Sequence, residues 1–192
     1  MNEVYSAAIT LPEDILEPIK IFKQGLESVV GKYASFYSDP VIILFAAVCD
    51  EHKLKLIEQK VESICRNQLP FIITLKDFDV FHAHRTVFIP TDDNSKTFLS
   101  AFRKKLSLEI KIAKYDEDVD FNIGKTPHVT IARSLTEDQY KTARKYFMNR
   151  KYASQFECNA ITWRKLIKTN SYSTYEPIKT FPFAQKNLSL FN

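Results

Sequence analysis

Two stretches of this chain repeat the same order of segments, and this repeat limits the folds open to it. Pro40 begins the apolar run PVIILFAAV, and Pro127, 87 residues later, begins PHVTIAR. Each run has the β-branched and apolar content of a strand, and each is followed by an apolar pattern at helical spacing and then by a further strand pattern. We interpret this as an internal duplication within a single domain, residues 1–192, whose two pseudo-symmetric halves span roughly residues 1–80 and 81–192.

The remaining segments complete two β-α-β-α-β halves. Strand patterns occur at 4–11, 40–48, 69–75, 84–89, 127–133 and 156–167, and helix patterns at 12–26, 52–65, 95–106 and 136–149. Residues 114–126 hold most of the local acidity and are expected to form a surface loop. Such halves predict an α+β fold, in which two facing antiparallel-type sheets enclose a central cleft and the helices lie outside.

Glycine content and charge narrow the possible functions. The 3 glycines are too few for a glycine-rich phosphate loop or a dinucleotide-binding fingerprint, so both of those nucleotide-binding classes are excluded. The formal net charge is +4, which favours an anionic ligand but falls short of a protein that coats nucleic acid.

The cysteines and the apolar runs indicate a cytoplasmic protein. Cys49, Cys65 and Cys158 are odd in number and form no CxxC pair, so neither a disulfide framework nor a cysteine zinc site is expected. The longest apolar run, residues 41–49, is too short to span a bilayer, and the first residues lack the pattern of a targeting segment. We therefore expect no membrane partner, and without a signal for an interface we expect a monomer.

The pattern His128-x-Thr130 is the sharpest chemical signal. Alternation along a strand places both side chains on one face, with Val129 and Ile131 on the other. An imidazole that titrates near neutrality beside a hydroxyl suits a phosphate, because the histidine moves a proton while the threonine holds a non-bridging oxygen. For an isolated H-x-T, a buried pair with satisfied hydrogen bonds is the more common interpretation.

Two further histidines stand close together in the sequence FHAHRTVF. His82 and His84 would share a face if the strand already begins there, and with His128 they would form a metal site or supply a replacement acid. An H-x-H pair without a nearby patterned carboxylate is a weak metal signal, so we favour rim histidines and expect neither a metal nor another cofactor. His52, at the start of a helix pattern, is expected to face solvent.

Other candidate binding residues are cationic or aromatic. Arg133 follows His128 by an odd step and reaches a phosphate only if the strand ends or twists there. The aromatic candidates for stacking on a base are Tyr37, Phe81, Trp163 and Tyr175, although most aromatic residues of a chain with 13% of them belong to the core. The basic stretch 144–152 interleaves charge with aromatics, and we interpret it as a solvated helix face rather than a backbone contact. Lys165 and Lys168 are candidates for the cleft mouth.

The chain resembles the two-histidine (2H) phosphoesterase superfamily, the 2'-5' RNA ligase-like proteins. The resemblance spans nearly the whole chain and is carried by PHVTIAR, by YSAAITLPED, by HRTVFIP to FRKKL, and by FECNAITWRKLI followed by YEPIKTFPF. It implies two H-x-T/S motifs, one in each half, and metal-free cleavage or formation of 2',5' linkages or opening of 2',3'-cyclic phosphates. His128 and Thr130 match the second motif, whereas Val41 and Ile43 stand at the histidine and hydroxyl positions of the first.

Half of the expected catalytic apparatus is thus replaced by apolar residues. In-line displacement at a phosphodiester needs a base on one side of phosphorus and an acid on the other, and losing one of them typically costs about 10²–10⁴-fold in rate. The leading hypothesis is a divergent member that binds a nucleotide, a cyclic phosphate or an RNA end through His128 and Thr130, with residual cyclic phosphodiesterase activity. The alternatives are a non-catalytic module for a nucleotide or small ligand, and a metal-dependent hydrolase that uses His82, His84 and His128.

Overall fold

The computed structural model describes residues 2–122, 125–168 and 173–185, and the elements below belong to these residues. The helices are α1 (Glu13–Val30), α2 (Glu51–Arg66), α3 (Asp93–Ile112) and α4 (Glu137–Phe147), with 3-10 turns η1 (His82–His84) and η2 (Asp116–Asp118). The strands are β1 (Glu3–Thr10), β2 (Val41–Cys49), β3 (Phe71–Lys76), β4 (Asp79–Phe81), β5 (Thr86–Pro90), β6 (Val119–Asp120), β7 (His128–Ala132), β8 (Ala153–Cys158), β9 (Ala160–Lys168) and β10 (Ser173–Pro182).

Three of the helices begin at side chains that accept hydrogen bonds from their first turn. Asp50 accepts from the Lys53 backbone N–H at the start of α2, and Asp92 accepts from that of Ser95 at the start of α3. Thr136 opens α4 with a capping box, because its hydroxyl accepts from the Gln139 N–H. These local signals determine where the helices start.

The predicted α+β fold of antiparallel strands is confirmed. The strands β10-β9-β1-β2-β7-β5-β4 follow one another in an eight-stranded sheet whose remaining strand, β6, pairs with β2, and β3 pairs with β8 in a separate two-stranded sheet. The two large sheets expected from the repeat are hydrogen bonded to each other, since β2 and β7 pair at one position, Ile42 with Val129. The two motif strands are therefore neighbours that splay apart beyond this contact.

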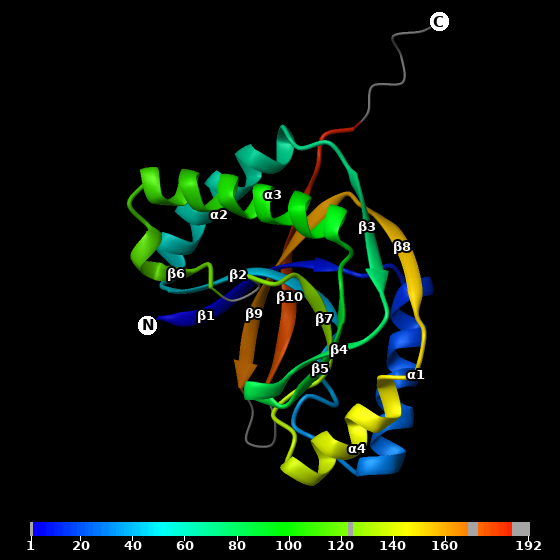
Figure 1. Cartoon of the computed structure of the whole chain (residues 1–192). Helices are drawn as coiled ribbons and strands as arrows, with labels where there is room; N and C mark the ends of the chain where they lie inside the picture. Colours follow the sequence, from blue (N-terminus) through cyan, green and yellow to red (C-terminus); the bar gives the residue numbers. More distant parts are fainter. Residues whose placement is uncertain (1, 123–124, 169–172, 186–192) are drawn as a thin grey trace, which may run out of the picture.

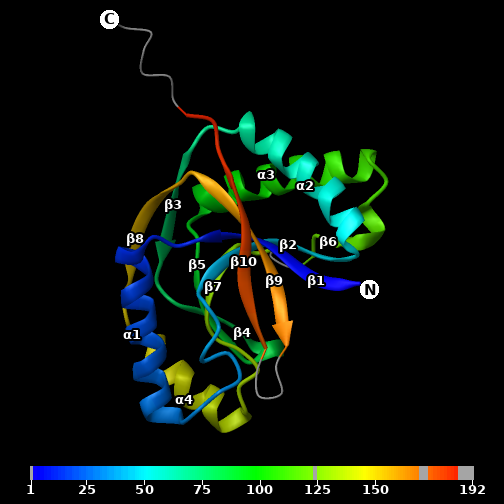
Figure 2. The ribbon, with the colours of Figure 1, turned by 180° about the vertical axis from the view of Figure 1, so that it is seen from behind.

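The helices flank the strands in two pairs. Figures 1 and 2 show α2 and α3 side by side at one end of the molecule and α1 beside α4 at the other. Each pair takes one helix from each predicted half, as expected for a pseudo-twofold arrangement; the division into halves itself stays a prediction. None of the helices described is long and apolar enough to cross a membrane.

The core lies on one face of the motif strands. Ile42 and Leu44 on β2 and Val129 and Ile131 on β7 are fully buried in it. Because side chains alternate along a strand, the residues between them are left for the opposite face. The side chains at the motif positions therefore point away from the core, toward the cleft.

Several segments differ from the sequence-based expectation. The single strand expected at 156–167 is two strands, because the chain leaves β8 after Cys158 and enters the other sheet as β9. The expected loop 114–126 contains β6, which pairs with β2 at Ala46 and Ala47. The strand expected from His84 begins at Thr86, because η1 and a left-handed Arg85 (φ 44°) precede it.

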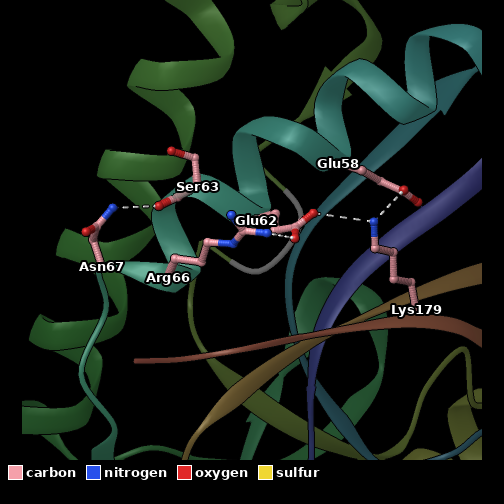
Figure 3. A network of polar contacts seen from close by, with 6 residues as sticks. All are labelled: Glu58, Glu62, Ser63, Arg66, Asn67 and Lys179. Carbon is pink, nitrogen blue, oxygen red and sulfur yellow. Dashed lines mark hydrogen bonds and ion pairs between the residues drawn. The ribbon is translucent and has the colours of Figure 1, made fainter. Parts of the chain in front are cut away.

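A polar network joins β10 to α2. Lys179 Nζ lies 3.2 Å from Glu58 Oε2 and 3.7 Å from Glu62 Oε2, and Glu62 also pairs with Arg66 at 2.6 Å (Figure 3). At the end of the same helix, the Asn67 amide donates to the Ser63 carbonyl over 2.9 Å. The network adds a contact with α2 to the pairing with β9 that already holds β10, the edge strand that carries Tyr175.

Candidate functional site

His128 and Thr130 line one cavity, of about 260 Å³, together with both residues at the first-motif positions. Strand alternation turns these side chains away from the core, to the face opposite Val129 and Ile131. The full lining is Val41, Ile43, Phe81, His84, Thr86, His128, Thr130 and Arg133. One wall is therefore polar and cationic, and the wall from β2 is apolar.

The imidazole of His128 is held by one backbone contact and two aromatic rings. Its Nδ1 lies 2.6 Å from the Thr126 carbonyl oxygen, which only accepts, so Nδ1 carries the proton and Nε2 is left with a lone pair. Phe81 and Phe88 pack against the ring at centroid distances of 5.2 and 4.9 Å. Burial lowers the pKa of His128 below its usual 6.5, partly offset by the Thr126 hydrogen bond, so the neutral form that accepts a proton prevails at pH 7.

A smaller cavity, of about 60 Å³, adjoins the first and shares part of its lining. The four shared residues are Val41, Ile43, Thr130 and Arg133, and the others are Ser35, Ser38, Asp39, Arg164 and Tyr175. Arg133 reaches both cavities because β7 ends at Ala132, which frees the arginine from strand alternation. Because the two cavities share four lining residues, they are neighbours; we call them together the cleft, and the smaller one the arginine pocket.

A buried lysine holds the loop that borders the arginine pocket. Lys23 on α1 donates hydrogen bonds to the backbone carbonyls of Ser35, over 2.9 Å, and of Ser38. Ser35 Oγ in turn accepts from the backbone N–H of Arg133 over 2.9 Å. Burial lowers the pKa of Lys23 to about 8, since desolvation disfavours its charge. The hydrogen bonds of Lys23 therefore hold this loop against α1, and the loop in turn holds the backbone at Arg133 through Ser35.

Arg164 on β9 is the charged residue with the deepest burial among the cleft residues that the sequence analysis missed; the others are Ser35, Ser38, Asp39 and Thr86. Arg164 is 6% exposed, and its guanidinium carbon lies 4.8 Å from the centroid of the Tyr175 ring. Burial also lowers its pKa, although Asp39 opposes this shift. The available signal was an arginine directly after Trp163, since alternation along the strand places the two side chains on opposite faces.

The structure separates the remaining candidates. His84 lines the larger cavity, whereas His82 is hydrogen bonded through Nδ1 to the Tyr140 hydroxyl at 2.7 Å and lines a different groove beside α4. The two histidines lie on a 3-10 turn, so they do not share a strand face. Tyr37 is 68% exposed and lines a surface hollow near α1, whereas Tyr175 borders the arginine pocket.

The other residues considered lie outside the cleft, apart from Phe81. Trp163 is fully buried in the core, Lys165 pairs with Glu3 at 2.6 Å, and Lys168 and His52 are exposed. The basic stretch ends α4 and borders the groove that contains His82. Within the part of the chain that the structure describes, no three histidine, cysteine or acidic side chains come together as a metal site. The trio His82, His84 and His128 is therefore not assembled.

The family model of the 2'-5' RNA ligase superfamily matches residues 41–169, about two thirds of the chain, including both motif strands. The chain belongs to the 2'-5' RNA ligase superfamily. This confirms the resemblance drawn from PHVTIAR and the segments around it.

Solved structures with the superfamily's fold match nearly the whole chain. Escherichia coli LigT complexed with 3'-AMP is 17% identical, with a TM-score of 0.74 over 96% of this chain and 100% of LigT. The protein TT0787 of Thermus thermophilus is 14% identical, with a TM-score of 0.72 over 95% and 98% of the two chains. Among curated protein sequences none matches this chain. At such identities the structural likeness concerns the fold.

Proposed function

We propose that this protein binds a phosphate ester of a nucleotide or RNA end in its cleft, with His128 and Thr130 in contact with the phosphate. The observation that carries the proposal is the shared cavity of these two side chains, with Arg133 at its edge. Thr130 supplies a hydroxyl donor, and Arg133 supplies a guanidinium whose fork matches phosphate oxygens. In the same superfamily, LigT has been solved with 3'-AMP, with ATP, with NADP+ and with phosphate.

Slow opening of a 2',3'-cyclic phosphate is the catalytic form of this proposal. Nε2 of His128 takes a proton from water, the water oxygen bonds to phosphorus, and the bond to the 2' or 3' oxygen breaks. The leaving oxygen takes its proton from solvent, because Val41 and Ile43 offer no acid on the wall from β2. The product is a phosphomonoester. With one proton-transfer residue the rate is expected to be well below that of a two-histidine site.

A non-catalytic binding module is the second candidate. The observation that favours it is the apolar wall of Val41 and Ile43, where a general acid or base is needed for rapid turnover. In this form His128 and Thr130 act as hydrogen-bonding partners of a bound nucleotide.

The proposal extends to a cytoplasmic monomer: Cys49, Cys65 and Cys158 are all free thiols, as a reducing compartment permits.

Titration calorimetry with adenosine 3'-monophosphate tests phosphate-dependent binding. Wild-type protein should bind the nucleotide, and Thr130→Val should weaken binding at least about 10-fold, since a hydrogen bond to a charged group contributes about 1.5–3 kcal/mol. Adenosine, without the phosphate, should bind much more weakly. Ser134→Ala is the control, because this exposed residue lies outside both cavities. Equal affinity for adenosine and its 3'-monophosphate would contradict the proposal.

A further inference from the structure

Arg164 is a buried cation whose Nε has no hydrogen-bond acceptor among the residues described. Its Nε is one of three buried side-chain nitrogen or oxygen atoms that lack a partner among the residues described, and it lines the arginine pocket. A buried donor left unpaired is costly, and more so on a charged group. The opposite charge that bears on Arg164 is Asp39, an exposed carboxylate on the pocket wall.

The Tyr175 ring contacts the Arg164 side chain but does not satisfy its hydrogen-bond donors. The ring contacts the guanidinium carbon at 4.8 Å, which is a cation–π contact. The five N–H groups of arginine lie in the guanidinium plane and require acceptors there. The tyrosine therefore orients the group and leaves its donors for another partner.

A second unpartnered polar atom belongs to the residue opposite Arg164 on the neighbouring strand. Ser6 on β1 is the cross-strand partner of Arg164 on β9, and the buried Ser6 Oγ also lacks a hydrogen-bond partner in the described chain. Side chains directly opposite each other in an antiparallel pair share one face. Two unpaired polar groups thus occur together at the sheet face that carries the arginine pocket.

The arginine pocket has the size and charge for one oxyanion. A cavity needs about 10–15 Å³ for each water oxygen, so about 60 Å³ accommodates roughly the four oxygens of a phosphate group. Its charged lining consists of Arg133, Arg164 and Asp39, which leaves an excess of positive charge. Thr130 and Arg133 belong to both cavities, so a group in the arginine pocket lies next to a phosphate held by His128.

We propose that the arginine pocket is a second anion subsite, in which Arg164 binds the second phosphate of a nucleotide that carries phosphates on both its 3' and 5' positions, while Arg133 lies between the two phosphates. The proposal rests on the proposed function, in which the first phosphate contacts His128 and Thr130. At Val41 and Ile43, β2 offers no polar group to an anion. Arg164 supplies a positive charge to the same pocket instead. The subsite selects ligands by their number of phosphates.

The affinity ratio between adenosine 3',5'-bisphosphate and adenosine 3'-monophosphate tests the subsite by calorimetry. In wild-type protein the bisphosphate should bind at least about 10-fold more tightly, as expected for hydrogen bonds between charged groups. Arg164→Gln should reduce this ratio to between 1 and 2 while leaving monophosphate affinity within about 3-fold. Arg164→Lys, which keeps the charge but loses the planar fork, should give an intermediate ratio and guards against misfolding of the first variant.

Lys165→Gln is the matched control. It removes the same charge from the next position of β9, where the side chain pairs with Glu3 instead of lining either cavity. The control should keep the wild-type ratio. A wild-type ratio near 1 with normal monophosphate binding, or an unchanged ratio in folded Arg164→Gln, would overturn the subsite and leave the proposed function standing. Absence of binding by either nucleotide would overturn both.

Discussion

Combining Val41→His with Ile43→Thr should accelerate hydrolysis of a nucleoside 2',3'-cyclic phosphate by about 10²–10⁴-fold, the usual contribution of one general acid or base. Both positions line the cavity that holds His128 and Thr130, so the new imidazole would stand at the reacting phosphorus as the missing acid. Their side chains lie on the cavity face of β2, whereas Ile42 and Leu44 fill the core on the other face. The substitutions therefore leave the packed side of the strand intact.

The pH dependence of the hydrolysis rate shows whether the new histidine acts as a general acid or only adds favourable charge near the phosphate. The wild-type rate should rise with pH as His128 loses its proton, with a midpoint below 6.5, because burial lowers the pKa of that histidine. The double variant should add a descending limb at higher pH, where the new histidine loses its proton. In a His128→Ala background the acceleration should disappear. A folded double variant that is no faster than wild type would contradict the assignment of position 41.

Trp163→Ala should destabilise the protein by about 3–5 kcal/mol, the usual cost of removing a large aromatic side chain from a core. Trp163 is fully buried, with ring centroids 6.1 Å from Tyr5 and 5.3 Å from Phe45, and it connects β9 to β1 and β2. For a chain of this length the midpoint of thermal unfolding should fall by roughly 6–20 °C. Differential scanning calorimetry measures both quantities.

Trp163→Phe is the conservative companion of that substitution. The indole N–H of Trp163 is buried and has no partner among the residues described, so replacing it with a hydrocarbon edge removes an unsatisfied donor. The cost should be clearly smaller than that of Trp163→Ala. Equal losses for both variants would contradict the assignment of this stability to aromatic packing.

Local patterns along the chain carried most of the fold prediction. The alternation in PHVTIAR correctly placed Val129 and Ile131 on the face opposite His128 and Thr130, and the structure shows that this face is the core. The break between β8 and β9 was missed, since no glycine or proline marks it: residues 156–167 read as one strand although Asn159 separates two sheets. Which strands pair depends on contacts between distant segments, and the sequence pattern does not encode these.

The part of the candidate site that lies on a single strand could be predicted from the sequence. His128 and Thr130 share a cavity as expected, and Arg133 joins them because the strand ends at Ala132. Arg164 was overlooked because it lines a cavity with Thr130 only through the order of strands in the sheet, where β1 and β2 lie between β9 and β7. His82 and His84 were grouped by spacing, but a 3-10 turn sends one toward the cleft and the other toward Tyr140.

A crystal structure of the complex with adenosine 3'-monophosphate tests the central claim most directly. The account predicts a phosphate group with one oxygen within hydrogen-bond distance of His128 Nε2 and another near Thr130 Oγ1, and with Arg133 at the edge of the site. An empty cleft at saturating nucleotide, or a phosphate bound elsewhere on the molecule, would contradict it.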